Sequence, residues 1–121
     1  MVKALFDTNI LIDYLNAVTE AKRELERYRD RAISVISWME VMVGATRKTA
    51  AGTRVFLDGF TILPLSGEVA EHAVELRREH RIKLPDAIVW ASARVDDRLL
   101  VTRNTKDFPA GEPGVRVPYE F

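Results

Sequence analysis

The sequence predicts an α/β domain: a three-layer α/β/α sandwich around a central, mostly parallel sheet of four to five strands. Short apolar runs alternate along the chain with stretches of ten or more residues that have helical spacing. This alternation is typical of parallel strands joined by right-handed helical crossovers. The chain has 121 residues and lacks internal repeats and Pro/Gly-rich linkers, so we expect residues 1–121 to form a single domain.

Composition and charge are those of a globular protein, with 47% apolar and 30% charged residues. The formal net charge is zero, so a nucleic acid would have to be met by a local patch. The absence of cysteine excludes disulfides and thiolate metal sites and fits a reducing cytoplasm, which is the expected location. No apolar run approaches the roughly 20 residues of a membrane helix, and no signal-peptide pattern is present, so we expect no membrane partner.

The first element is a buried strand over residues 2–6, which are mostly apolar and include a β-branched and an aromatic residue. Asp7-Thr8-Asn9 ends the strand, because these side chains bond nearby backbone groups and favour helix caps. Residues 10–15 then have helical spacing, and a polar helix is predicted over residues 19–30. Asp7 therefore follows the carboxyl end of a strand, where open α/β sheets bind ligands.

A second strand is predicted over residues 32–36. Ser37 then opens a helix to about residue 48, because Ser37-Trp38-Met39-Glu40 has the pattern of a capping box. The helix expected over residues 48–58 is weaker, since Gly52 in its interior costs about 1 kcal/mol relative to alanine.

The third strand covers residues 60–63, and Ser66 caps a long helix that runs to about residue 80. Pro85 suits the first turn of the next helix, which is apolar nearly all round and should be well buried. The chain closes with a fourth strand over residues 98–102 and a short last one over residues 115–117.

Four acidic residues accompany these elements. Asp7 follows the first strand, Glu40 lies one helical turn beyond the second, and Asp107 follows the fourth. Asp86 opens the buried helix that leads into the fourth strand. Gathered carboxylates repel one another and raise one another's pKa, whereas a hard divalent cation with a preference for oxygen ligands removes that difficulty. The shared position of the acids therefore predicts a site for Mg²⁺ or Mn²⁺.

Each acid also has a purely structural interpretation. Asp7 could cap the first helix, Glu40 could complete a capping box, and Asp86 gains roughly 0.3–1 kcal/mol from the helix dipole. Asn104 and Asp107 could be ordinary turn formers. The two interpretations are compatible, because a helix start can orient a catalytic carboxylate.

Four segments, in this order along the chain, resemble the motifs of PIN-domain ribonucleases. They are Leu5–Ile12, Ser34–Val41, Leu84–Ala87 and Leu100–Phe108. Chain length and motif order also resemble VapC, the toxin of a type II toxin–antitoxin pair. A single motif such as Asp-Thr-Asn is weakly specific, but four in order in so short a chain are strongly specific. The resemblance spans residues 2–108 and implies a PIN-like fold.

The resemblance implies an endoribonuclease that hydrolyses RNA phosphodiester bonds, in tRNA or rRNA for example, with one or two Mg²⁺ or Mn²⁺ ions. Asp7, Glu40 and Asp86 would be its catalytic acids and metal ligands. The fourth acidic position is open: the family often has an acid near Asn104, so either Asp107 supplies the charge or Asn104 binds as a neutral oxygen. Small polar residues that support such a site match Thr8, Ser37 and Thr102.

Arg103 and Lys106 flank Asn104 and are the predicted RNA-binding residues, because phosphates require positive charge near the acids. The resemblance further implies a VapB-type antitoxin, a homodimer, and a larger complex in which the antitoxin relieves an inhibition of translation or growth. The helix that carries Glu40 has more apolar surface than one stripe requires, which indicates a groove for an amphipathic antitoxin segment. Its apolar residues are Trp38, Met39, Met42 and Val43.

Three other classes compete with this interpretation. A phosphate-accepting receiver would need an acid adjacent to Asp7 and a late lysine where Arg103 stands. A haloacid-dehalogenase-like phosphatase would need Asp-x-Asp, but the chain has Asn9. A catalytically silent PIN-like binding module stays open, because Asn104 occupies the fourth acidic position.

Overall fold

The computed structural model describes residues 2–109 and 111–121 and confirms the predicted α/β sandwich. The described chain forms one five-stranded sheet in the order β3-β2-β1-β4-β5, in which every neighbouring pair is parallel. The strands are β1 (Lys3–Phe6), β2 (Asp30–Ser34), β3 (Thr61–Leu63), β4 (Leu99–Val101) and β5 (Val115–Arg116). Because β1 is the central strand, Asp7 lies at the middle of the sheet's carboxyl edge.

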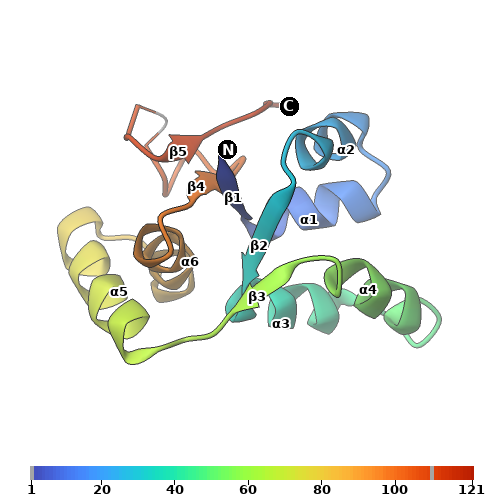
Figure 1. Ribbon diagram of the computed structural model, residues 1–121, viewed down its shortest axis with the longest axis horizontal. Helices are drawn as coiled ribbons and strands as arrows, with labels where there is room; N and C mark the ends of the chain where they lie inside the picture. The colour runs from blue at the N-terminus through green and yellow to red at the C-terminus, as the bar shows by residue number, and fades with distance from the viewer. Residues whose placement is uncertain (1, 110) are drawn as a thin grey trace.

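Helices cover both faces of the sheet (Figure 1). One face carries α1 (Thr8–Leu15), α2 (Thr19–Glu26), α3 (Val35–Gly44) and α4 (Ala50–Leu57), and the other carries α5 (Gly67–His80) and α6 (Leu84–Val95). Within the part of the chain that the structure describes, no helix has the length and apolar character needed to cross a bilayer.

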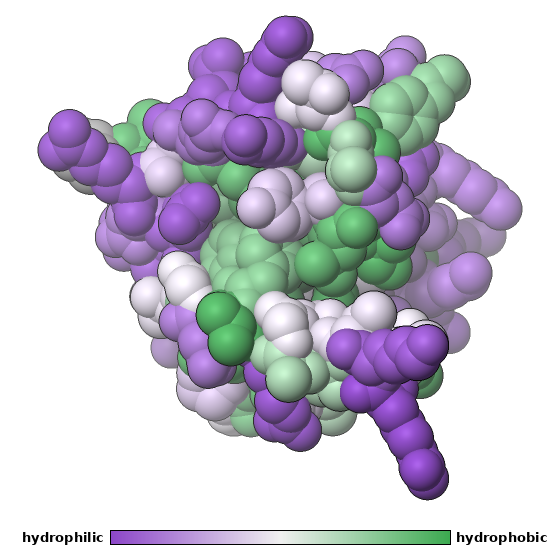
Figure 2. Space-filling view, turned by 90° about the vertical axis from the view of Figure 1, so that its right-hand side faces the viewer, coloured by the Kyte–Doolittle hydropathy of each residue, from purple (hydrophilic) through white to green (hydrophobic). Residues whose placement is uncertain are grey.

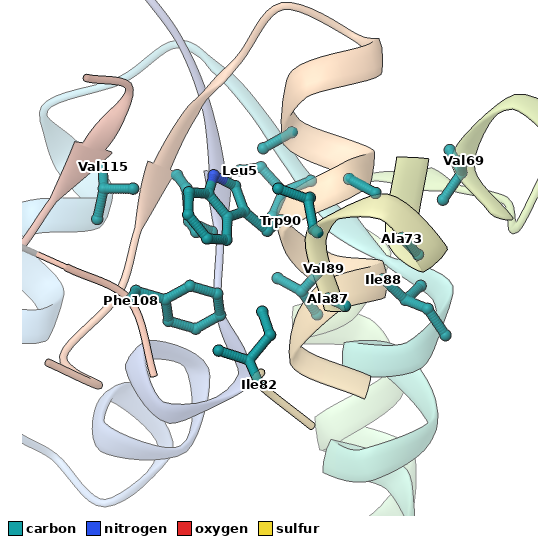
Figure 3. Packing of buried hydrophobic residues seen from close by; sticks show 14 residues of the cluster. Leu5, Val69, Ala73, Ile82, Ala87, Ile88, Val89, Trp90, Phe108 and Val115 are labelled. Carbon is teal, nitrogen blue, oxygen red and sulfur yellow. The ribbon is translucent and has the colours of Figure 1, made fainter. Parts of the chain in front are cut away.

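Two apolar cores lie between these layers. Strand β1 contributes residues to both cores, because successive side chains of a strand point to opposite faces of the sheet. Leu5 packs against α5 and α6, whereas Ala4 and Phe6 pack against α1–α4. In the first core the rings of Trp90 and Phe108 meet edge to face with centroids 5.7 Å apart (Figure 3). Both side chains are fully buried. Because Phe108 directly follows Asp107, this contact fixes the Asp107 turn beside α6.

The start of α3 differs from the prediction. Ser34 is the N-cap, and its Oγ accepts a hydrogen bond from the backbone N–H of Ile36 at 3.1 Å. Ser37 lies inside the helix and is fully buried, so the predicted capping box from Ser37 to Glu40 is wrong. The apolar run before Ser37 fits a buried strand and a buried helix equally well, and periodicity alone does not separate the two.

The other boundaries follow the predictions closely. The helix predicted over residues 19–30 ends at Glu26, because the chain from Asp30 onward pairs with β1 as strand β2. Ser66 caps α5 as expected, with its Oγ accepting from the backbone N–H of Val69 at 3.2 Å. Pro85 lies in the first turn of α6, which is the most buried helix, as predicted.

Substituting the observed cap should destabilise the protein. Ser34→Ala removes the acceptor for the Ile36 N–H, so the free energy of unfolding should fall by about 1 kcal/mol, within the 0.5–2 kcal/mol typical of lost N-caps. Urea denaturation measures this change. Ser66→Ala, which removes the serine cap of α5, gives a second loss of stability with which to compare it. Unchanged stability in Ser34→Ala would contradict the assignment of Ser34 as the cap.

Candidate functional site

The register of the sheet brings the predicted polar residues to one edge. Phe6 is paired with Val101, so the next residues outward are Asp7 and Thr102. The backbone N–H of Asp7 still donates to the Val101 carbonyl at 2.9 Å, which continues the pairing one step beyond the strand. On the other side of β1, strand β2 ends and α3 begins, which brings Glu40 to the same edge.

Asp7 is buried, with 4% of its surface exposed, and it is held through both carboxylate oxygens. Its Oδ1 accepts from the backbone N–H of Thr8 at 2.8 Å. Its Oδ2 accepts from the Thr102 hydroxyl at 2.8 Å and from the Asn9 amide at 3.2 Å. Burial raises the pKa of Asp7, and the charge of Glu40 adds to this, while the hydrogen bonds oppose it. The orientation of this carboxylate is therefore set by the start of α1 and by the residue that follows β4.

Glu40 is the exposed member of the group and is tied to α1 through a hydroxyl. The Thr8 hydroxyl donates to Glu40 Oε1 at 2.8 Å and lies 3.0 Å from the hydroxyl of Ser37. Thr8, Ser37 and Glu40 thus link the starts of α1 and α3. Sequence reasoning had placed Thr8 and Ser37 near the site, and the structure brings both to Glu40.

Asp86 lies half-buried in the first turn of α6 and is influenced by the other three acids. Its pKa is raised to about 7, first by desolvation, then by the charge of Asp7, and further by Asp107 and Glu40. Although Asp86 follows no strand, α6 brings it to the same edge, as the sequence analysis required.

The turn after β4 orients Asp107 through Asn104. The Asn104 side-chain amide donates to Asp107 Oδ2 at 3.0 Å, and the Asp107 backbone N–H donates to Asn104 Oδ1 at 3.2 Å. The Asn104 backbone N–H donates to the Thr102 hydroxyl oxygen at 3.0 Å. The Asn104 hydrogen bond is the main cause that lowers the pKa of Asp107. A side-chain hydrogen bond with Asp86 follows, and the charges of Lys83 and Lys106 add to it. Asn104 therefore braces a charged Asp107.

The two predicted RNA-binding residues lie in different surroundings. Lys106 is exposed on the Asp107 turn. Arg103 forms two hydrogen bonds with Asp13, from Nε to Oδ2 at 2.8 Å and from Nη2 to Oδ1 at 3.1 Å. Sequence reasoning missed Asp13, which is buried on α1. The sequence feature that could have identified Asp13 is its position three residues after Ile10, which places a charged side chain on the face of the helix that packs against the core.

The four acids provide a donor set suited to a hard divalent cation. Within residues 2–109 and 111–121, none of them belongs to an ion pair, and no three acidic or histidine side chains lie close enough together to hold a metal ion by themselves. Mg²⁺ commonly retains several waters and takes only one or two carboxylates directly. The chemistry of these oxygen donors therefore suits Mg²⁺ with several retained waters, and it suits Mn²⁺ equally.

The chain is similar to known proteins over nearly its whole length. A family model described as the PIN domain matches residues 4–110. Ribonuclease VapC10 from Mycobacterium tuberculosis is 35% identical, over 89% of this chain and 87% of the relative. A chain in a toxin–antitoxin complex from Klebsiella pneumoniae is 52% identical with a TM-score of 0.94, over 98% of this chain and 100% of that one. A chain of DNA-bound VapBC from Salmonella typhimurium, 23% identical with a TM-score of 0.78, has the same fold over 99% of this chain and 98% of its own.

Removing the charge of Asp86 should stabilise the protein at alkaline pH in EDTA. The folded protein keeps the Asp86 proton up to about pH 7, whereas the ordinary pKa is 3.8, so stability falls as pH rises between these values. Asp86→Asn should abolish this loss of stability. Solvent screening at a half-exposed group limits the gain in the free energy of unfolding to about 1 kcal/mol, so the melting temperature at pH 8 should rise by up to about 3–5 °C.

Thermal unfolding at pH 5 and pH 8 tests this expectation, and the difference between the two proteins should shrink at pH 5. Asp58→Asn, the same change at an exposed acid on the surface, is the control. If Asp86→Asn were less stable than the wild type at pH 8, stabilisation by the α6 dipole would outweigh the repulsion among the acids.

Proposed function

The chain belongs to the PIN-domain family, and from this premise we propose that it is a divalent-metal-dependent endoribonuclease, the toxin of a VapBC-type toxin–antitoxin pair. The gathering of Asp7, Glu40, Asp86 and Asp107 at one edge of the sheet supports this proposal most directly. Repulsion within this group is balanced when a divalent cation lies among the acids.

In this proposal Asp7 and Asp86 hold Mg²⁺ or Mn²⁺ directly, while Glu40 and Asp107 bind through water or hold a second ion. Asp107 takes the fourth acidic position, because Asn104 uses both ends of its amide to brace it. When bound, the cation lowers the pKa of water and stabilises the charge on the attacking and leaving oxygens of the phosphodiester.

The chain's own residues keep the acids in place during hydrolysis. Thr102 supports Asp7, and Thr8 with Ser37 supports Glu40. Glu40 is exposed, and the described residues hold it through Oε1, so its second oxygen is available to orient the attacking water and accept its proton. Positioning of this kind supplies a large part of the rate enhancement in phosphoryl chemistry.

Positive charge beside Asp107 serves the RNA backbone. Lys106 is exposed on the same turn, and Lys83 precedes α6; both lower the pKa of Asp107. These two lysines are the proposed phosphate contacts. The charge of Arg103 is already balanced by Asp13, so Arg103 contributes less to RNA binding than the sequence predicted.

The proposed antitoxin site is an apolar groove between α1, α3 and α4 that has Glu40 in its lining. The groove has a volume of about 350 Å³, and its lining includes Ile12, Leu15, Glu40 and Val41. The four apolar residues that the sequence predicted for such a groove do not line it, and two of them pack against the core instead: Trp38 and Met42. Figure 2, seen from the side of α1, α2 and α4, shows an apolar strip across the middle of this face with polar side chains above and below. An amphipathic helix fits such a groove, and a basic residue on it would meet Glu40. A homodimer and a larger complex with antitoxin form part of the same proposal.

Cleavage of RNA should depend on the metal and on Asp86. Asp86→Asn should lower the rate by about 100-fold or more, since the loss of an outer-shell partner alone typically costs 10–100-fold. EDTA should abolish cleavage by the wild type, and added Mg²⁺ or Mn²⁺ should restore it. The measurement is cleavage of total tRNA and rRNA by purified protein.

Asp58→Asn is the matched control and should cleave like the wild type. Cleavage that survives both EDTA and Asp86→Asn would contradict the metal site. A wild-type protein that cleaves no RNA and binds no Mn²⁺ in calorimetry would instead be a catalytically silent binding module.

A charge placed in the groove should weaken antitoxin binding. Leu15 is 42% exposed in the groove. Leu15→Glu should lower the affinity by about tenfold or more, as for a central interface residue, when it is measured with a VapB-type antitoxin that neutralises the wild type. Val74→Glu is the control, because Val74 is 45% exposed on α5 across the sheet. Calorimetry measures both affinities, and equal losses in the two variants would contradict the proposed groove.

A further inference from the structure

A second polar cluster lies next to the acidic site and joins three distant parts of the chain. It consists of Asp13 on α1, Arg103 after β4, and Tyr119 near the C-terminus. We propose that residues 117–121 form a C-terminal strap that positions the Asn104–Asp107 turn, with Arg103 and Tyr119 as positioning residues. This inference rests on the proposed function of the acidic site.

The cluster is an ion pair between a buried acid and a partly exposed arginine, with a tyrosine as the third partner. Asp13 is 6% exposed. It accepts two hydrogen bonds from the Arg103 guanidinium, and Tyr119 donates its hydroxyl hydrogen to Asp13 Oδ2 at 2.8 Å. A partly buried pair of this kind keeps its geometry only while the remaining lone pairs are satisfied. Tyr119 supplies that third contact.

Phe121 covers the outer side of the same guanidinium. The Arg103 guanidinium carbon lies 4.9 Å from the centroid of the Phe121 ring, within the range of a cation–π contact. Phe121 is itself 76% exposed, so this contact does not come from burial in the core. Phe121 thus contacts Arg103 directly, whereas Tyr119 acts on Arg103 through Asp13.

Arg103 connects this cluster to the acids through its own backbone. It lies between Thr102, which donates to Asp7, and Asn104, which braces Asp107. The Arg103 backbone N–H also donates to Asn9 Oδ1 at 3.1 Å, and the Asn9 amide donates to Asp7. A shift of Arg103 would therefore disturb the supports of Asp7 and Asp107 together.

The chain contains a matched cluster that serves as an internal control. Glu24 is 3% exposed, accepts two hydrogen bonds from Arg116 at 2.7 and 3.0 Å, and accepts one from the Tyr28 hydroxyl at 2.9 Å. Both clusters have an acid, a bidentate arginine and a tyrosine hydroxyl. Tyr28 hydrogen-bonds none of the four site acids, and its cluster reaches the site only through strand pairing, in which the Arg116 carbonyl accepts from the Thr102 backbone N–H at 3.0 Å. Tyr28→Phe therefore removes the same kind of bond without touching residues 103–107.

The test compares Tyr119→Phe with Tyr28→Phe in the full-length protein. Backbone amide exchange followed by NMR reports the order of residues 102–107, and calorimetry with Mn²⁺ reports the metal affinity. Tyr119→Phe should speed exchange at residues 102–107 and raise the Mn²⁺ dissociation constant by about three- to tenfold, below the 10–100-fold typical of a direct outer-shell partner. Tyr28→Phe should leave the Mn²⁺ affinity and the exchange at residues 103–107 unchanged, while lowering the melting temperature by about as much as Tyr119→Phe does. The Thr102 N–H is left out of this comparison, because it donates to the Arg116 carbonyl of the control cluster.

Equal effects of the two substitutions on exchange and on Mn²⁺ binding would overturn the strap. Arg103→Lys is the second variant, since lysine keeps the charge but loses the bidentate contact with Asp13. It should change both the amide exchange and the Mn²⁺ dissociation constant more than Tyr119→Phe does. If the wild type binds no Mn²⁺ and cleaves no RNA, the proposed function fails, while the exchange comparison still decides whether residues 117–121 order the turn.

Discussion

Mutual repulsion among four carboxylates is the constraint around which the carboxyl edge of the sheet is arranged. Asp7 is buried, and three hydrogen bonds to its two oxygens offset part of the resulting rise in its pKa. Asp86 receives no comparable set of hydrogen bonds from the residues that the structure describes, and its pKa rises to about 7. Two carboxylates in one site thus have different environments, which is the usual way that a fold separates their chemical roles. A divalent cation would favour the charged form of both.

The scaffold keeps these acids together through contacts made elsewhere in the fold. Pairing of β1 with β4 sets Asp7 beside Thr102. Burial of Phe108 against Trp90 holds the Asp107 turn beside α6, the helix that begins at Asp86. Each acid comes from a different element, so no single helix or loop determines the site. A site built this way depends on the rigidity of the core.

Local patterns were sufficient to predict much of the fold and the position of the acids at one edge of the sheet. The alternation of strands and helices predicted the parallel sheet, and Ser66 was recognised as a cap because its pattern is local. Ser34 was missed because Val35 and Ile36 fit a strand as well as a helix. The Asp13 contacts could not be predicted, since Arg103 and Tyr119 lie 90 and 106 residues further along the chain. Such pairs depend on tertiary packing that the local sequence does not encode.

The most direct test of the central claim is anomalous diffraction from crystals of the wild-type protein grown with Mn²⁺. One or two anomalous peaks should lie at the carboxyl edge of the sheet, with carboxylate oxygens of Asp7 and Asp86 among the ligands. Peaks bound only at other surface acids, with this edge empty at saturating Mn²⁺, would contradict a divalent-cation site formed by these four residues.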